Sequence, residues 1–328
     1  KYPEFIRREM SHSFHGLNRN KIGLALDLKD GEHTEALLNL ASQSDLVIEN
    51  FTSGTLDRLG LSYEAMMEVN PSLVLLSLSG FGSSSRLGKM RAYGLVLSAL
   101  SGFETGIEDP ITDEFVGSPT FVASDPNAAT YGLFAAITSL LEARSSGKGA
   151  HVEFSQLEGM AHVSANQDKG LKEIAATLGL ETSFMNSSSS ILQCYDDDYI
   201  CVAWPTDITD TDKKSFSKKI CTLTLKEAQN FLKNVNLQYV KVIEKPTEVG
   251  AGSVNKGTLI PTIHPVTGPE EIVAAPWWID GNRAPLRKSA PVLGEGNDYV
   301  IGFLLNWTVE DRARIMAFDQ EKRHDKKT

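Results

Sequence analysis

The sequence contains few cysteines, only three in 328 residues. Cys194, Cys201 and Cys221 include no Cys-x-x-Cys pair, and an odd number of thiols cannot form a complete disulfide set. This pattern excludes a disulfide scaffold and argues against a dithiol redox centre. We interpret the three cysteines as structural thiols, which fits a cytoplasmic protein.

Long apolar runs are also absent from the sequence. No segment approaches the roughly 20 consecutive apolar residues that a helix needs to cross a bilayer. The chain opens at Lys1, and its start does not have the charged and then apolar pattern of a signal peptide. The sequence therefore predicts no membrane partner.

Basic residues are outnumbered by acidic ones, 32 against 42, which gives a formal net charge of −10. Nucleic acids and anionic membranes bind basic surfaces, so neither is expected as a main partner. An anionic ligand would need a local cluster of cations. The length and the hydrophobic content of 41% are sufficient for a large core and two domains.

Several familiar site motifs are missing. The segment Gly80-Phe81-Gly82 lacks the third glycine of a dinucleotide fingerprint, and the sequence has neither a Gly-Lys-Ser/Thr phosphate loop nor a Gly-x-Ser-x-Gly nucleophile elbow. We find no pair at metal-binding spacing among the seven histidines, so no metal site is predicted.

Residues 21–160 alternate between strand and helix patterns. Strands are predicted at 22–28, 45–49, 73–78 and 151–154, and helices at 31–43, 62–69 and 125–146, with another helix beginning at Ser155. Asp125-Pro126 is typical of an N-cap followed by the first helical residue, and Gly147 of a helix end. The alternation predicts an α/β fold with a mainly parallel sheet.

A polar segment without periodicity, residues 180–190, marks the expected domain boundary. We predict a large domain from residues 1–185 plus 286–328, and a small domain from 186–285. The small domain is expected to hold a hairpin within 191–203, a helix at 224–234 and a strand at 238–243, with 245–290 mostly loop. A last helix is predicted at 309–318.

Six segments together resemble a known family. They are Asn18–Lys29, Asp45–Leu61, Asn70–Gly82, Arg91–Tyr93, Ala143–Glu158 and Ala290–Glu295. In order and spacing the chain resembles the class III CoA-transferases, the family that includes formyl-CoA transferase, carnitine CoA-transferase and the α-methylacyl-CoA racemases. The resemblance implies a doubly wound, mainly parallel, Rossmann-like large domain that binds CoA, a smaller α+β domain, and an interlocked dimer.

Glu158 is the candidate catalytic residue. By resemblance, a carboxylate at this position attacks an acyl-CoA thioester to form an enzyme-bound acyl anhydride, and the CoA then passes through an enzyme thioester to an acceptor carboxylic acid. The start of a helix stabilises such a negative charge. The family nucleophile is an aspartate, however, and Ser155-Gln-Leu-Glu158 also matches a capping box that would explain the glutamate structurally.

Two other functions remain open. The chain could be a non-catalytic subunit of a heteromeric class III CoA-transferase, because a glutamate replaces the aspartate and the family's usual first strand is missing ahead of Lys1. An acyl-CoA racemase is the third alternative. By resemblance it needs a histidine in the turn Leu100–Gly106, and this turn has none.

The resemblance also assigns the ligand-binding positions. It implies that coenzyme A enters as an acyl-CoA substrate and that a small carboxylic acid is the second substrate. The implied protein partner is either an identical chain or a sister CoA-transferase chain. The positions that match CoA contacts are Lys29, Asn50, Phe51, Arg58, Arg91 and Tyr93. For each cation the alternative is an ordinary solvated surface charge. Asp125 is either close to the acyl site or only a helix N-cap.

Overall fold

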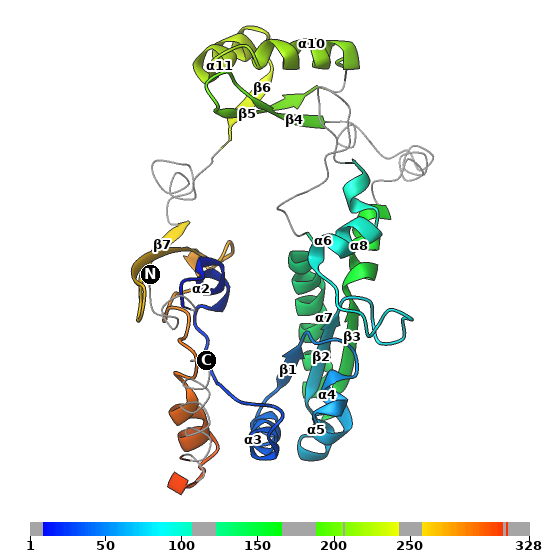
Figure 1. Ribbon diagram of the computed structural model, residues 1–328, viewed down its shortest axis with the longest axis vertical. Coiled ribbons are helices and arrows are strands. Elements are labelled where there is room, and N and C mark those ends of the chain that lie inside the picture. The colour runs from blue at the N-terminus through cyan, green and yellow to red at the C-terminus, as the bar shows by residue number, and fades with distance from the viewer. Residues whose placement is uncertain are drawn as a thin grey trace, which may run out of the picture. The chain divides into compact units, whose positions relative to one another are not determined.

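The structure is a computed structural model (Figure 1). It describes residues 9–106, 123–165, 188–205, 207–242, 258–310 and 313. Two compact units divide the chain: one comprises Lys1–Ser44, Leu59–Asn70 and Glu244–Thr328, and the other comprises Asp45–Arg58 and Pro71–Ile243. We call them the terminal unit and the sheet unit. The domain limits expected from the sequence stay a prediction.

The sheet unit contains a three-stranded parallel sheet, as the sequence predicts. Its strands are β1 (Leu46–Glu49), β2 (Val74–Ser79) and β3 (Ala150–Ser155), in the order β1-β2-β3. Leu76 in the middle strand is opposite Ile48 on one side and Val152 on the other. Residues 74–76 of β2 are at most 1% exposed, which explains their unbroken apolar sequence. The chain is thus a mixed α/β protein.

Helices accompany this sheet. The longest, α7 (Ser124–Ser146), packs against β2 and β3 (Figure 1) and ends at Gly147, whose φ of 72° is the left-handed conformation predicted for this glycine. The helix α8 (Gln156–Ala165) follows β3 directly. The shorter elements are α4 (Thr55–Arg58), α6 (Gly94–Leu100) and the 3₁₀ turn η1 (Phe103–Gly106).

The predicted N-cap role of Asp125 is wrong. The helix α7 begins one residue earlier, at Ser124, and its N-cap residue is Ala123, which makes no side-chain capping bond. Asp125 lies within the first helical turn, where its Oδ1 accepts a hydrogen bond from the Ser124 hydroxyl at 3.2 Å. The Asp125 carboxylate therefore accepts from the Ser124 hydroxyl, whereas the carboxylate of an N-cap residue would accept from a backbone N–H.

The sheet unit also contains a three-stranded antiparallel sheet. Its strands are β4 (Ser188–Gln193), β5 (Tyr199–Trp204) and β6 (Gln238–Lys241), and the hairpin predicted within 191–203 is confirmed. The helices α10 (Asp210–Ile220) and α11 (Leu225–Asn234) pack with it around a core in which Ile200, Val202 and Leu232 are fully buried (Figure 1). The sequence did not lead us to expect α10.

Cys194 lies in this core, and its thiol is expected to be unreactive. Burial, followed by the charges of Asp196, Cys221 and Asp198, raises its pKa from 9.0 to about 11. In a Cys201→Ser/Cys221→Ser variant, the one remaining thiol should react with Ellman's reagent at pH 8 at least about 100-fold more slowly in the folded than in the urea-unfolded chain. Equal rates would contradict this placement of Cys194.

The terminal unit combines helices with short hairpins. Its helices are α2 (His12–Asn18), α3 (Gly31–Ala41) and α5 (Tyr63–Val69), followed late in the chain by the π-helical segment η4 (Asp298–Leu304). The strands β7 (Leu259–His264) and β8 (Gly268–Val273) pair antiparallel, as do β9 (Trp278–Ile279) and β10 (Asn282–Arg283). No helix in the described part of the chain combines the length and apolarity needed to cross a membrane.

One prediction fails in this unit, and another is incomplete. Residues 22–28 are not a strand, because the backbone of Ala25 pairs with the Asn297 side chain, at 2.8 Å and 3.1 Å, instead of with a neighbouring strand. Residues 245–290 were predicted to be mostly loop, and the described part of this range, 258–290, also contains the strands β7 to β10. The helix predicted at 309–318 falls largely outside the described residues.

Candidate active site

The candidate site lies where the parallel strands of the sheet unit end. The strands β1, β2 and β3 terminate at Glu49, Ser79 and Ser155, and all three run in the same direction. Their carboxyl ends therefore share one edge of the sheet, which is where open α/β sheets bind ligands. The backbone N–H of Leu157 donates to the carbonyl of Gly80 at 3.0 Å, so the start of α8 is tied to the end of β2.

A cavity of about 360 Å³ opens at this edge. Its walls come from residues 50–52 after β1, from Leu78 and Gly80 of β2, from positions between 88 and 97 in the following loop and α6, and from the first turns of α7 and α8. This volume is at the small end of the range found for small-molecule sites. The lining combines apolar side chains with the polar side chains of Asn50, Thr52, Asp125 and Gln156.

Three of the six predicted binding residues line this cavity. They are Asn50, Phe51 and Tyr93. The Phe51 N–H donates to the Glu49 carboxylate at 2.7 Å, which holds the turn after β1, while the rings of Phe51 and Tyr93 remain 42% and 78% exposed. Two exposed aromatic faces beside a cavity are suited to stacking on a planar ligand group.

The three predicted cationic residues, Lys29, Arg58 and Arg91, are not among the described residues that line the cavity. Arg91 is exposed and lies between two lining residues, Met90 and Ala92. Arg58 ends α4, where its guanidinium donates to Thr55 Oγ1 at 2.8 Å, and Thr55 in turn contacts the lining residue Thr52. Lys29 belongs to the terminal unit, whereas the other five predicted binding residues belong to the sheet unit.

Glu158 does not line the cavity, although Gln156 two residues earlier does. Residues two apart on a helix project to different faces, so Gln156 faces the cavity and Glu158 projects from another face of α8. Glu158 is exposed, and its N–H donates to the Ser155 hydroxyl at 3.3 Å, which is half of the predicted capping box. The carboxylate makes no hydrogen bond to another residue in the described ranges.

Asp125 is the one carboxylate among the described lining residues, and Gln156 is a lining residue that was not predicted from the sequence. The signal for Gln156 was available, because it is the first helical residue after a strand and therefore sits at the sheet edge. Among the described residues, the lining includes no histidine or cysteine.

Comparison with known sequences identifies relatives of this arrangement. The sequence model described as CoA-transferase family III matches residues 1–235. Acetyl-CoA:oxalate CoA-transferase of Acetobacter aceti is 36% identical over 157 residues, which are 46% of this chain and 39% of the relative. Human succinyl-CoA:glutarate CoA-transferase is 30% identical over 179 residues, which are 52% of this chain and 39% of the relative. The chain spans about two-fifths of the length of these curated relatives.

Solved structures show a similar fold. A CAIB/BAIF family protein from Brucella suis superposes with a TM-score of 0.69 at 20% identity, covering 89% of this chain and 83% of that one. The Rv3272 protein of M. tuberculosis gives a TM-score of 0.67 at 18% identity, covering 89% of this chain and 87% of that one. At these identities the likeness establishes the fold alone.

Proposed function

This chain belongs to CoA-transferase family III, and on that premise we propose that it transfers CoA from an acyl-CoA to a small carboxylic acid. The observation that carries the proposal is the convergence of Asn50, Phe51 and Tyr93, chosen from the sequence as CoA contacts, around one cavity at the carboxyl ends of parallel strands. A cavity of about 360 Å³ can take part of the substrate, and Glu158, in the same first turn of α8 as the lining residue Gln156, would meet the thioester at the rim of the cavity.

We propose Glu158 as the nucleophile. Its carboxylate attacks the thioester carbonyl and expels CoA thiolate, which leaves an acyl anhydride on the enzyme. The thiolate attacks the glutamyl carbonyl, releases the donor acid and forms an enzyme thioester. The acceptor carboxylate then displaces the thiolate to form a second anhydride, and the thiolate attacks its acceptor carbonyl, so that the new acyl-CoA leaves and Glu158 is regenerated. The exposure of Glu158 in the first turn of α8 supports this role.

A second function is favoured by one observation, the amide of Gln156 at the cavity wall. An amide cannot form an acyl anhydride, so a chain that presents Gln156 to the substrate fits a non-catalytic subunit that binds CoA beside a catalytic sister chain. A racemase has less support, because the turn Leu100–Gly106, which includes η1, contains no histidine. The doubly wound large domain, the interlocked dimer and the cytoplasmic location remain proposals.

Covalent trapping separates the first two functions. The purified chain is incubated with an acyl-CoA, treated with borohydride or hydroxylamine, and mapped by peptide mass spectrometry. A mass change on Glu158 supports the catalytic role. A chain that binds CoA but carries no label on any acidic residue supports the non-catalytic subunit, and native mass spectrometry of the complex from its own host then identifies the sister chain.

Replacing Arg91 by alanine should weaken CoA binding by about tenfold, because one charge-assisted contact to a phosphate is worth about 1.5–3 kcal/mol. Isothermal titration calorimetry with CoA measures the effect. Arg144→Ala, at the opposite end of α7 from Asp125, is the matched control and should bind CoA like the wild type. Equal affinities for the Arg91 and Arg144 variants would contradict the assignment of Arg91.

A further inference from the structure

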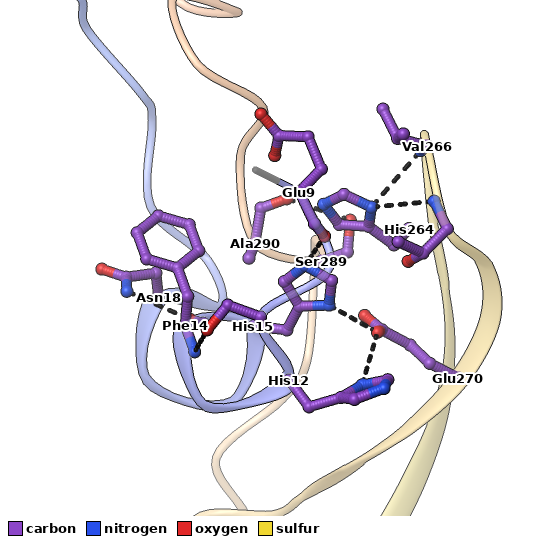
Figure 2. Close-up of polar contacts among 12 residues, drawn as sticks. Glu9, His12, Phe14, His15, Asn18, His264, Val266, Glu270, Ser289 and Ala290 are labelled. Atoms are coloured by element: carbon purple, nitrogen blue, oxygen red, sulfur yellow. Dashed lines mark hydrogen bonds and ion pairs between the residues drawn. The ribbon is translucent and has the colours of Figure 1, made fainter. Parts of the chain in front are cut away.

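A cluster of two histidines and a glutamate lies in the terminal unit, outside the proposed active site. His12 and His15 come from α2, and Glu270 comes from β8, more than 250 residues later (Figure 2). One potential ligand atom from each residue lies within 4.8 Å of the other two. His12 and His15 are three positions apart on a helix, a spacing that places both side chains on one face.

The contacts inside the cluster are close. His15 Nδ1 lies 2.6 Å from Glu270 Oε2, and His12 Nδ1 lies 4.0 Å from the same oxygen. The side chains of His15 and Glu270 are 1% and 6% exposed, whereas that of His12 is 84% exposed. Two buried groups and one solvent-facing group form a site with an open side.

The contacts of the His15 ring are the second observation. Its Nε2 lies 2.7 Å from the carbonyl oxygen of Glu9, and a carbonyl only accepts, so Nε2 carries a proton (Figure 2). In a neutral ring, Nδ1 then presents a lone pair to the carboxylate at 2.6 Å. At that distance the two groups share a hydrogen bond. Tetrahedral Zn–N and Zn–O bonds of about 2.0–2.2 Å place two ligand atoms roughly 3.3 Å apart, so a metal ion replaces this hydrogen bond only when the nitrogen and the oxygen separate by about 0.7 Å. A ligating histidine that donates its other N–H to a backbone carbonyl is the usual arrangement at metal sites.

Glu270 has an unused coordination position. Its Oε1 is buried and has no hydrogen-bond partner among the residues that the structure describes. The basic groups within 4.0 Å of its carboxylate, in the same part of the chain, are the two imidazoles. Leaving a buried carboxylate oxygen unsatisfied is costly, and a bound metal ion removes that cost.

His264 supports the position of His15. The two rings stack with centroids 4.1 Å apart and an interplanar angle of 16°. His264 Nδ1 accepts from the N–H groups of Val266 and Thr267, at 3.3 Å and 3.2 Å. The stacked His264 ring therefore holds the plane of the His15 ring.

We propose that His12, His15 and Glu270 bind a divalent transition metal ion of the zinc type. Imidazole nitrogens favour Zn²⁺, Co²⁺ and related ions over Mg²⁺ and Ca²⁺, which prefer oxygen ligands. Three protein ligands leave a fourth position for water on the exposed His12 side. The metal joins α2 to β8 and so ties the beginning of the described chain to its late hairpin. The sequence prediction of no metal site overlooked the His12-x-x-His15 pair and could not anticipate Glu270.

The test uses the untagged full chain, stripped of metal with a chelator and desalted. Calorimetric titration with Zn²⁺ should give one site per chain, and Co²⁺ should give a visible absorption band with the intensity of a four-coordinate site. His12→Ala should weaken Zn²⁺ binding at least about tenfold. Because the His12 side chain is 84% exposed, this variant should keep the wild-type circular dichroism spectrum and metal-free melting temperature.

Glu270→Gln should also weaken binding, and Zn²⁺ should raise the melting temperature of the wild type but not of either variant. His151→Ala, a change at an exposed histidine of β3, is the matched control and should bind Zn²⁺ like the wild type. The proposal is overturned if the wild type takes up less than one Zn²⁺ per chain at micromolar free metal. It is equally overturned if His12→Ala binds as tightly as the wild type, since the cluster is then only a hydrogen-bonded histidine and glutamate pair.

Discussion

Replacing Glu158 by glutamine is expected to lower kcat for CoA transfer by about 10⁴-fold or more, because the amide cannot attack a thioester. The side chain is exposed and its carboxylate makes no hydrogen bond to another described residue, so the change should leave the melting temperature close to that of the wild type. Steady-state assays with acyl-CoA and an acceptor acid measure kcat. Calorimetry with CoA should give an unchanged Kd, since Glu158 does not line the cavity.

Two neighbouring variants show which group acts. Gln156→Ala alters the cavity wall without removing a carboxylate and should change KM more than kcat. Asp125→Asn removes the one carboxylate that lines the cavity. If Glu158→Gln retains activity while Asp125→Asn loses it, the nucleophile is misassigned. If the wild-type chain alone is inactive and gains activity only with a sister chain, with Glu158→Gln behaving normally, the non-catalytic subunit is the correct function.

Replacing Gly149 by alanine is expected to lower the free energy of unfolding of the sheet unit by about 4 kcal/mol, a large effect for one methyl group. A Cβ at this position would lie 1.9 Å from the carbonyl oxygen of Leu73. Neither backbone can move away easily, because Gly149 N donates to the Pro71 carbonyl at 2.8 Å and Ala150 N donates to the Leu73 carbonyl at 3.2 Å. These bonds begin the pairing of β2 with β3.

Gly147→Ala is the control for this change. Gly147 has a positive φ of 72°, but nothing lies within 4 Å of an added Cβ, so only the backbone strain of about 1–2 kcal/mol applies. Urea denaturation followed by circular dichroism should therefore shift the midpoint of Gly149→Ala much more than that of Gly147→Ala. Equal shifts would mean that β2 and β3 do not approach as closely as described.

Local patterns predicted much of the fold. The apolar runs of β1 and β2 and the end of α7 at Gly147 were readable because each depends on burial or on backbone conformation within a few residues. The α11 N-terminus was also readable, and there Thr224 and Glu227 form a full capping box. The hairpin of β4 and β5 was recognisable from the acidic turn between two apolar segments.

Features that depend on distant partners were not predictable in this way. Residues 22–28 have the composition of a strand, but the Asn297 side chain satisfies the backbone of Ala25, and no local pattern signals that contact. The strands β7 and β8 were missed because Pro and Gly in this segment are typical of loops, although here each fits the edge of a two-stranded hairpin.

The sequence by itself indicated the family, the parallel direction of the strands at the candidate site and the residues placed at the strand ends, because these follow from short-range pattern and motif spacing. The strand order β1-β2-β3 came from the structure. Only the tertiary structure decided that Gln156 lines the cavity and that Glu270 reaches the two histidines of α2. Which residue of α8 faces the cavity depends on the residue at which the helix begins, and local sequence patterns do not set this position accurately. The contact between His15 and Glu270 depends on the folding of segments that lie more than 250 positions apart.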